Sequence, residues 1–394
     1  MTQWLPVPDG SDFPLENLPF GVVARRRPGS VPTVVVRIGD HVVDLAAAGI
    51  EPDLTRRPGL DRLLASGRVS EVRERAGEVI TGPERPEVVM HVDDVDVCRP
   101  FEVGDVVDFY SSIHHATNVA RVLRPDSPSL PANWRHVPTG YHGRSSSVVV
   151  SGSPIPRPSG MLGDGEGPPR FAPTEALDLE VEVGFVVMGQ PATGIAPDEA
   201  DRHVAGAVLL NDWSARDIQA FEYQPLGPFL AKSFATTISP WLVTLDALRP
   251  YLVASPPQRP APAPHLRAER PWAIDLHLRA ALDGTEICAT NFAGMYWTFA
   301  QQLAHLTSNG ATTRAGDLFG SGTVSGADAG QWGSLIEATY GGTRPLRLDD
   351  GRSRTYLEDG DTVRLTGWCG GGGRPRIGFG EAVGRVESRP GPVR

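Results

Sequence analysis

Cysteine is scarce in this 394-residue chain, and the few that occur form no motif. Cys98, Cys288 and Cys369 lie far apart, are odd in number, and have neither metal-ligand nor redox spacing. This pattern gives no sign of a disulfide framework and favours a reducing, cytosolic setting. It also makes a zinc site less favoured, because no histidine or cysteine pair has ligand spacing.

Long apolar runs and an excess of positive charge are lacking as well. No apolar run approaches the length of a membrane-spanning helix, and the N-terminal stretch has no basic segment followed by an apolar run. The chain has 37 basic and 47 acidic residues, a net charge of −10 and a pI of about 5.5. We therefore expect a cytoplasmic protein, with neither nucleic acid nor a membrane as its partner.

Three common catalytic motifs are missing from the sequence. There is no G-x-S-x-G elbow, no G-x-x-x-x-G-K-[ST] phosphate loop, and no G-x-G-x-x-G that follows a strand. The glycine run at 370–373 has no phosphate-loop context and reads as a flexible turn. A serine hydrolase, a P-loop NTPase and a Rossmann dehydrogenase are therefore disfavoured.

Lysine is the scarcest of the charged residues, because Lys232 is the only one while the other 36 basic residues are arginine. Lysine is a compact point charge whose pKa shifts readily, whereas arginine is a planar fork that stays charged. A chain that uses arginine almost everywhere else is expected to need an ammonium group at this position. The alternative is that Lys232 is a chance surface residue.

The abundant residues indicate the fold class. With 44 glycines and 37 prolines among short apolar runs, the sequence favours a β-rich fold with many turns. Residues 1–101 read as one unit without paired titratable groups, and residues 102–394 as the unit that carries the chemistry. We expect strands at 177–189 and 205–214, a Pro/Gly loop at 156–173, and a helix over 215–223 capped by Ser214 with Asp217. The clearest helical pattern lies within 295–310.

Carboxylates gather at strands and strand ends. Glu180 and Glu182 alternate with apolar residues, so both side chains point to the same face of the predicted strand. Asp108 and Asp212 each follow a strand-like run. Four carboxylates suit a hard divalent ion, Mg²⁺ or Ca²⁺, and the spacing does not choose between the two. The alternative for Glu180 and Glu182 is the solvated face of an amphipathic strand.

The helix predicted after Asp212 has a polar face. Arg216, Gln219 and Tyr223 lie three and four residues apart in turn, so one face presents all three. Such a face suits an anionic, oxygen-rich substrate, although an ordinary exposed helix face would look the same. His114 and His115 follow Asp108 closely, and one of them could serve as a general base near neutral pH.

Several long motifs together resemble the fumarylacetoacetase family. They are DFYSSIHHATNV, LPANWRHVPTGYHGRSSSVVVSG, LDLEVEVGF, NDWSARDIQAFEYQPLGPFLAKSFATTISPW, NFAGMYWTFAQQLAHLTSNG, SGTVSG and GSLIE, in this order. The resemblance implies a mainly β (α+β) fold, with a small N-terminal SH3-like barrel over 1–101 and a C-terminal mixed β-roll over 102–394. It also implies a homodimer that hydrolyses a carbon–carbon bond of the small anionic β-diketo acid 4-fumarylacetoacetate, the last step of tyrosine and phenylalanine breakdown.

The resemblance assigns roles to individual positions. It implies that His115 activates water, that Glu337 orients it, and that Arg216, Gln219 and Lys232 stabilise developing negative charge. The implied metal ligands are Asp108, Glu180, Glu182 and Asp212, with Lys232 and Thr236 near a second metal position. The implied substrate contacts are Tyr110, Arg124, Tyr141, Gln219, Tyr223 and Thr323.

The chain departs from the family pattern at three places. Ala231 and Ala235 stand where the family usually has glycine, and His114 stands where histidine is unusual. Two other functions remain open at this point. One is an acylpyruvase, decarboxylase or isomerase of the same superfamily, and the other is a non-catalytic β protein that binds a divalent ion.

Overall fold

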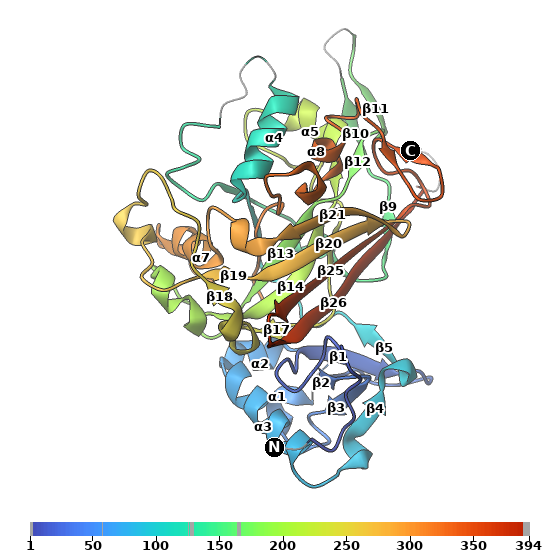
Figure 1. The fold of residues 1–394 in the computed structure, drawn as a ribbon, viewed down its shortest axis with the longest axis vertical. Coiled ribbons are helices and arrows are strands. Elements are labelled where there is room, and N and C mark those ends of the chain that lie inside the picture. Colours follow the sequence, from blue (N-terminus) through green and yellow to red (C-terminus); the bar gives the residue numbers. More distant parts are fainter. Residues whose placement is uncertain (1–2, 57, 125, 127–129, 164–166, 389–394) are drawn as a thin grey trace.

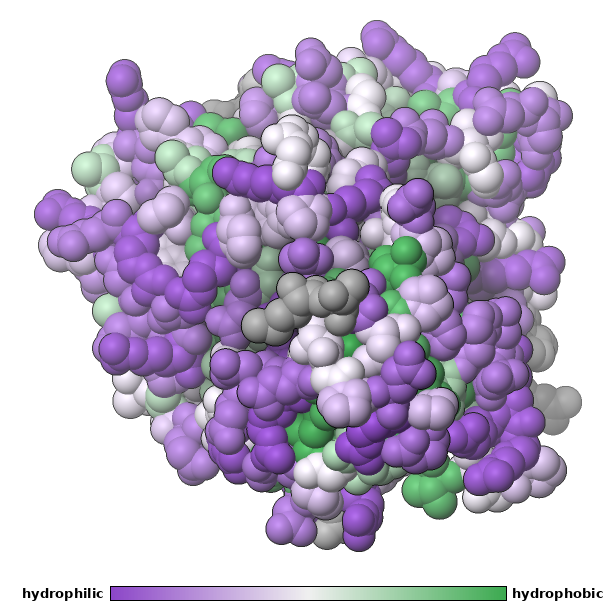
Figure 2. All heavy atoms as spheres, turned by 60° about the horizontal axis from the view of Figure 1, so that its bottom comes forward, coloured by the Kyte–Doolittle hydropathy of each residue, from purple (hydrophilic) through white to green (hydrophobic). Residues whose placement is uncertain are grey.

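The computed structural model describes residues 3–56, 58–124, 126, 130–163 and 167–388. The chain forms a mainly β fold in which a small N-terminal part lies against one end of a larger part built on two sheets (Figure 1). This confirms the predicted fold class, including a barrel-like N-terminal sheet. On the face seen in Figure 2, hydrophobic side chains form only small separate patches.

The N-terminal part is a five-stranded antiparallel sheet with helices beside it. Valine-rich runs form the strands, in the order β4-β3-β2-β1-β5. Their bounds are β1 Phe20–Arg25, β2 Thr33–Ile38, β3 His41–Asp44, β4 Val89–His91 and β5 Val95–Cys98. The helices are α1 Pro52–Thr55, α2 Asp61–Ser66 and α3 Val69–Thr81.

The larger part is organised around an eight-stranded sheet in the order β7-β6-β22-β13-β14-β16-β8, with β17 also paired to β14. In this sheet β22 lies between β13 and β6, although it is more than 100 positions away from both in the sequence. The strands are β6 Val106–Phe109, β7 Gly140–His142, β8 Val148–Val150, β13 Val181–Val187, β14 Val204–Asp212, β16 Thr236–Ile238, β17 Val243–Thr244 and β22 Leu318–Gly320.

A second sheet of five strands packs on this one, and the main hydrophobic core lies between the two. Its order is β21-β20-β25-β26-β9, with β9 Pro154–Pro156, β20 Leu276–Leu282, β21 Thr285–Asn291, β25 Thr362–Gly371 and β26 Arg374–Glu387. The helices of the larger part are α4 Ile113–Leu123, α5 Arg216–Glu222, α6 Leu245–Leu248, α7 Phe299–Thr307 and α8 Leu335–Ala338.

Four short strand pairs complete the larger part. Two of them lie close to the site discussed below, because β12 pairs with β15 next to β14 and β10 contacts α5. The paired strands are β10 Ser159–Leu162 with β11 Arg170–Pro173, β12 Leu177–Asp178 with β15 Ser214–Ala215, β18 Leu252–Val253 with β19 Ala273–Ile274, and β23 Leu346–Arg347 with β24 Ser353–Arg354.

One face of the eight-stranded sheet changes character along its strands. Near one end its side chains join the hydrophobic core of the N-terminal part; they are Val106, Val186, Leu210, Ile238 and Leu318. Two or four residues further along the same strands, the same face presents Asp108, Glu182, Asp212, Thr236 and Gly320. The N-terminal part therefore covers the apolar end of this face, and the acidic end is left for a cavity.

Two local predictions were wrong. Ser214 does not cap α5, because it lies in β15 and its hydroxyl donates to the carbonyl of Asp212 at 3.0 Å. Asp217 instead accepts from the backbone nitrogen of Glu175 at 2.7 Å and from Thr174. The stretch predicted as a Pro/Gly loop at 156–173 contains the hairpin strands β10 and β11, while residues 164–166 lie outside the described residues.

The other predicted elements are present. The helix predicted at 215–223 is α5, and the one predicted within 295–310 is α7. The strand predicted at 177–189 is formed by β12 and β13, and the one predicted at 205–214 by β14 and β15.

No helix in the described part of the chain combines the length and the apolar character that a membrane crossing requires.

Candidate active site

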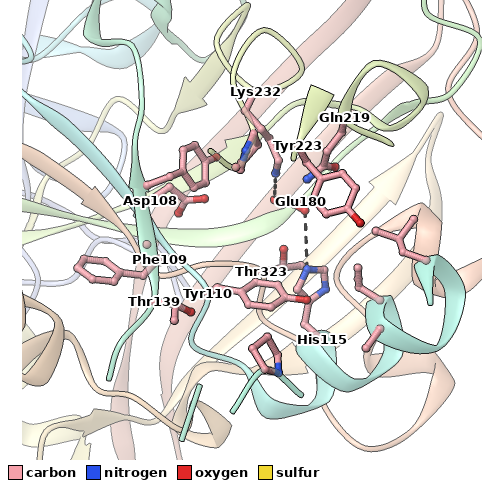
Figure 3. A pocket seen from close by; sticks show the side chains of 18 of the residues that line it. Asp108, Phe109, Tyr110, His115, Thr139, Glu180, Gln219, Tyr223, Lys232 and Thr323 are labelled. Carbon is pink, nitrogen blue, oxygen red and sulfur yellow. Dashed lines mark hydrogen bonds and ion pairs between the residues drawn. The ribbon is translucent and has the colours of Figure 1, made fainter. Parts of the chain in front are cut away.

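A cavity of about 370 Å³ opens at the acidic end of the sheet. Its walls come from β6, β13, α4, α5 and the loop that follows α5 (Figure 3). Twelve of the predicted site residues line it, and they are Asp108, Tyr110, His115, Arg124, Tyr141, Glu180, Glu182, Arg216, Gln219, Tyr223, Lys232 and Thr323.

Four buried carboxylates meet at the base of this cavity. One oxygen from each of Asp108, Glu180, Glu182 and Asp212 lies within 4.8 Å of the others. The sheet register explains their meeting, since Asp108 pairs with Gly320 and the backbone nitrogen of Asp212 donates to the carbonyl of Glu180 at 3.3 Å. All four are less than a tenth exposed, so the alternative of a solvated strand face is wrong for Glu180 and Glu182.

The pKa values of these carboxyl groups show that nearby positive charge reaches some of them and not others. Burial and the charge of Asp212 raise the pKa of Asp108 to about 7. Burial and the neighbouring carboxylates, Asp108 first among them, raise the pKa of Glu182 well above its usual range. For Glu180, burial alone would raise the pKa, but the charges of Lys232 and Arg216 outweigh it and hold the pKa below its ordinary value.

The chemistry of this donor set fits a hard divalent ion. Carboxylate oxygens are the preferred ligands of Mg²⁺ and Ca²⁺. Asp108 Oδ1 and Glu182 Oε1 are buried without a hydrogen-bond partner, as expected of atoms reserved for a ligand. The space between them is kept open by Gly320, where a Cβ would lie 2.4 Å from Asp108 Oδ1 and 2.9 Å from Glu182 Oε2. The acidic cluster can therefore bind a divalent metal.

Lys232 is buried in this cluster and is not a surface residue. Its ammonium donates to Asp212 Oδ2 at 2.8 Å and also to Glu180 Oε2. Burial alone would lower the pKa of Lys232, but Asp212 and Glu180 outweigh it and raise the pKa above its ordinary value. Tyr141 donates its hydroxyl to the same oxygen of Asp212 at 2.8 Å. A compact charge with three donors suits this crowded position better than a planar guanidinium.

Arg216 links the acidic cluster to α5. Its Nε donates to Asp178 Oδ2 at 2.7 Å, its Nη2 to Glu180 Oε1 at 2.7 Å, and its Nη1 to Gln219 Oε1 at 3.1 Å. Because the carbonyl oxygen of the Gln219 amide is engaged in this way, its NH₂ group is left as the donor for a bound molecule. The predicted polar helix face is therefore built into the cavity wall and is not an ordinary exposed face.

His115 and Glu337 form a buried pair although they lie 222 positions apart. His115 Nδ1 lies 2.7 Å from Glu337 Oε2, and His115 Nε2 lies 3.8 Å from Glu180 Oε1. Figure 3 shows His115 and Lys232 approaching Glu180 from opposite sides. Burial alone would raise the pKa of Glu337, but His115 and the hydrogen bonds of Asn118 and Ser334 outweigh it and lower the pKa. His114 is half-buried and does not line the cavity.

The remaining predicted residues fall into two groups. Tyr110, Arg124, Tyr141, Tyr223 and Thr323 all line the cavity, and the ring of Tyr110 meets that of His115 edge-on at 5.3 Å. Thr236 is buried on β16 directly opposite Asp212, but it is not part of the cavity lining. The structure therefore brings the predicted residues together around one cavity, although three of them are not part of its lining. Asp212 belongs to the acidic cluster, Thr236 lies opposite it, and Glu337 is paired with His115.

Sequence reasoning missed several residues that hold this arrangement. Asp178 accepts from Arg216 and from the backbone nitrogens of Leu335 and Ile336 at 2.7 and 3.0 Å, at the start of the helix that carries Glu337. It could have been found, because it lies two residues before Glu180 in the same alternating pattern. Ser325, Ser334 and Asn118 contact Glu337, and no local pattern indicates this.

The two alanines that depart from the family pattern face apolar neighbours. Ala231 packs with Leu162, Ala215 and Ile218, and Ala235 belongs to the main core. Their methyl groups therefore fill space behind the backbone that carries Lys232 and Thr236.

Two family models match this chain. The model described as fumarylacetoacetate hydrolase C-terminal matches residues 106–387, and the model described as fumarylacetoacetase N-terminal matches residues 16–91. The chain is 41% identical to fumarylacetoacetase of Rattus norvegicus and to that of Homo sapiens, over 97% of this chain and 98% of each relative. It is 40% identical to fumarylacetoacetase of Arabidopsis thaliana, over 99% of both chains.

Solved structures with low sequence identity share the fold. A fumarylacetoacetate hydrolase from Exiguobacterium antarcticum matches with a TM-score of 0.57 and 18% identity, over 94% of this chain and all of that chain. A 2-hydroxyhepta-2,4-diene-1,7-dioate isomerase from Mycobacterium marinum matches with a TM-score of 0.53 and 16% identity, over 95% of this chain and all of that chain.

Proposed function

This chain belongs to the fumarylacetoacetate hydrolase family, and from that premise we propose that it hydrolyses the carbon–carbon bond of 4-fumarylacetoacetate to fumarate and acetoacetate. The observation that carries the proposal is that a histidine–carboxylate pair and a cluster of acidic side chains meet at one cavity. His115, paired with Glu337, directs Nε2 toward an acidic cluster that suits a divalent ion.

The metal would be held by Asp108, Glu180, Glu182 and Asp212, and we propose Mg²⁺ or Ca²⁺. A divalent ion at this position supplies Lewis-acid polarisation of a carbonyl oxygen and charge stabilisation for an enolate. Lys232 donates to Asp212 and Thr236 lies opposite it, and we propose that a second metal position lies near these two residues.

His115 is proposed to move the proton. Its Nε2 accepts a proton from a water molecule, and the hydroxyl oxygen forms a bond to the carbonyl carbon on the fumaryl side. The bond from that carbon to the neighbouring CH₂ carbon then breaks, and the electron pair stays with the departing acetoacetate portion. The imidazolium of His115 returns its proton to the CH₂ carbon, which becomes the methyl carbon of acetoacetate. Glu337 holds Nδ1–H throughout, and one proton is released overall because the new carboxylic acid ionises.

Three donors are proposed to stabilise the negative charge that develops. Lys232 has a third N–H beyond its bonds to Glu180 and Asp212, and the amide of Gln219 is oriented by Arg216. Donors that are already fixed in a water-excluded site stabilise developing charge at little reorganisation cost. Arg216 contributes its charge and keeps Glu180 and Gln219 in place.

The remaining cavity wall is proposed to recognise the substrate, which is a dianion with a flat unsaturated chain. Arg124 supplies a cation, and Tyr110, Tyr141, Tyr223 and Thr323 supply hydroxyls. The apolar Val119, Leu123 and Pro131 line the same cavity and suit the hydrocarbon portion. We also propose that the protein acts as a cytoplasmic homodimer in tyrosine and phenylalanine breakdown.

A substrate panel tests this function. Purified protein, supplied with Mg²⁺ or Ca²⁺, should consume fumarylacetoacetate faster than acylpyruvates or other β-diketo acids. Faster turnover of an acylpyruvate, or decarboxylation or isomerisation without hydrolysis, would assign the chain to another activity of the superfamily. Metal binding without turnover of any compound in the panel would favour the non-catalytic binding protein.

A further inference from the structure

The two oxygens of Glu337 have unequal surroundings. Oε2 accepts from His115 Nδ1 at 2.7 Å, from Ser334 Oγ at 2.7 Å and from Ser325 Oγ at 2.9 Å. Oε1 accepts from Asn118 Nδ2 at 3.0 Å, and among the described residues this is its one donor. Among the described residues, Asn118 is therefore the one that fixes the position of Oε1, and with it the rotation of the carboxylate about Oε2.

Asn118 shares a helix face with His115. The two lie three residues apart on α4, so both side chains reach Glu337 from the same side. The start of α4 is itself tied to the network, because Ser112 Oγ accepts from the backbone nitrogen of His115 at 3.2 Å and donates to the carbonyl of Ser325 at 3.0 Å. Ser325 in turn donates to Glu337, which closes a circuit of hydrogen bonds around the pair.

A second cavity lies behind Glu337. It has a volume of about 340 Å³ and is lined by Asn118, Arg121, Trp332, Glu337, Tyr340 and other residues of this region. It shares none of its lining residues with the catalytic cavity. Glu337 is only 1% exposed although it lines this cavity, and Asn118, which lines it as well, donates to Glu337 Oε1.

We infer that Asn118 is a positioning residue for the His115–Glu337 pair. By fixing Oε1 it holds Oε2 against His115 Nδ1, which keeps the imidazole in the Nδ1–H tautomer and leaves Nε2 as the proton acceptor. Asn118 does not line the catalytic cavity, so it acts through Glu337 and not on the substrate. The kinetic consequence rests on the proposed function, but the tautomer does not.

The kinetic test compares Asn118→Leu with Thr117→Val. Leucine has the same branched arrangement of side-chain heavy atoms as asparagine but has no donor, and we expect kcat to fall roughly 10- to 100-fold with little change in KM or metal affinity. Thr117 donates only to the carbonyl of Ile113 within α4, so Thr117→Val disturbs the same helix without touching Glu337 and should keep kcat within about twofold of the wild type. An unchanged kcat in Asn118→Leu would overturn the inference. So would an equal loss in both variants.

A spectroscopic test is independent of turnover. In protein with ¹⁵N-labelled histidine, assigned with His115→Gln, the wild type should show Nδ1 protonated and Nε2 bare. Asn118→Leu should mix the two tautomers, and Asn118→Asp should show the larger change because its carboxylate faces Oε1. A pure Nδ1–H tautomer in both variants would overturn the inference, whatever the substrate of the enzyme proves to be.

Discussion

Gly320 and Asp108 stand opposite each other on adjacent parallel strands, and a Cβ at Gly320 would lie 2.4 Å from Asp108 Oδ1. The same Cβ would lie 2.9 Å from Glu182 Oε2. The absence of a side chain here is therefore part of the geometry of the acidic cluster, because it leaves room for two carboxylates to converge.

Gly320→Ala should weaken metal binding. The methyl group would displace Asp108 or Glu182, and we expect the metal Kd to rise roughly 10- to 100-fold, as for changes that misorient metal ligands. Isothermal titration calorimetry with Mg²⁺ and Ca²⁺ measures this directly. Gly294→Ala is the matched control, because a Cβ there meets no atom within 4 Å. Equal affinity in the two variants would show that the carboxylates do not meet at an ion.

Lys232→Arg tests why the chain has one lysine. The charge is kept, but a guanidinium cannot place three donors at one point between Glu180 and Asp212. We expect kcat to fall by about 10²- to 10³-fold, the range for loss of one donor to a developing oxyanion. Steady-state kinetics at saturating metal provide the measurement. An arginine variant with normal kcat would refute the role assigned to the ammonium.

The metal-free protein should lose stability as the pH rises toward 7. The pKa of Asp108 is raised to about 7 from an ordinary value of 3.8, so between these values the folded chain holds a proton that the unfolded chain has lost. Stability falls with rising pH wherever the folded state binds more protons. The Tm in the presence of a chelator should therefore decrease from about pH 5 to about pH 7, and the raised pKa of Glu182 acts in the same direction.

Metal binding should show the opposite dependence on pH. The ion requires ionised carboxylates and displaces their protons, so affinity should rise with pH up to about pH 7 and change less above it. Thermal melts with and without Mg²⁺ or Ca²⁺ at several pH values give both dependences. A metal-free Tm that increases over this window, together with an affinity independent of pH, would contradict the protonation assigned to Asp108.

Much of the site follows from local sequence patterns. The alternation around Glu180 and Glu182 predicts their common face, and Leu179, Val181 and Val183 do lie in the core on the other side. The contrast between one lysine and 36 arginines directs attention to Lys232 before any fold is known. Asp178 follows the same alternation, and it was missed because a third carboxylate in a strand has no evident partner until the start of α8 is placed beside it.

Other features depend on tertiary structure and have no local signal. His115 and Glu337 lie 222 positions apart and meet because β6 and β22 pair in parallel, so only family resemblance connects them in the sequence. The spacing of Ser214 and Asp217 fits a capping box, yet pairing of β15 with β12 places Ser214 in a strand. Strand pairing there outcompetes a local cap, since it buries Ser214 and Ala215 completely.

The most direct test of the account is turnover of fumarylacetoacetate by His115→Ala, with metal retained. We expect the variant to bind Mg²⁺ or Ca²⁺ with nearly wild-type affinity, because His115 is not one of the four clustered carboxylates. We also expect kcat to fall by about 10²- to 10⁴-fold, the usual contribution of a general base. Metal affinity and hydrolysis are measured on the same preparation. A variant that binds the ion and still hydrolyses fumarylacetoacetate at the wild-type rate would contradict the mechanism.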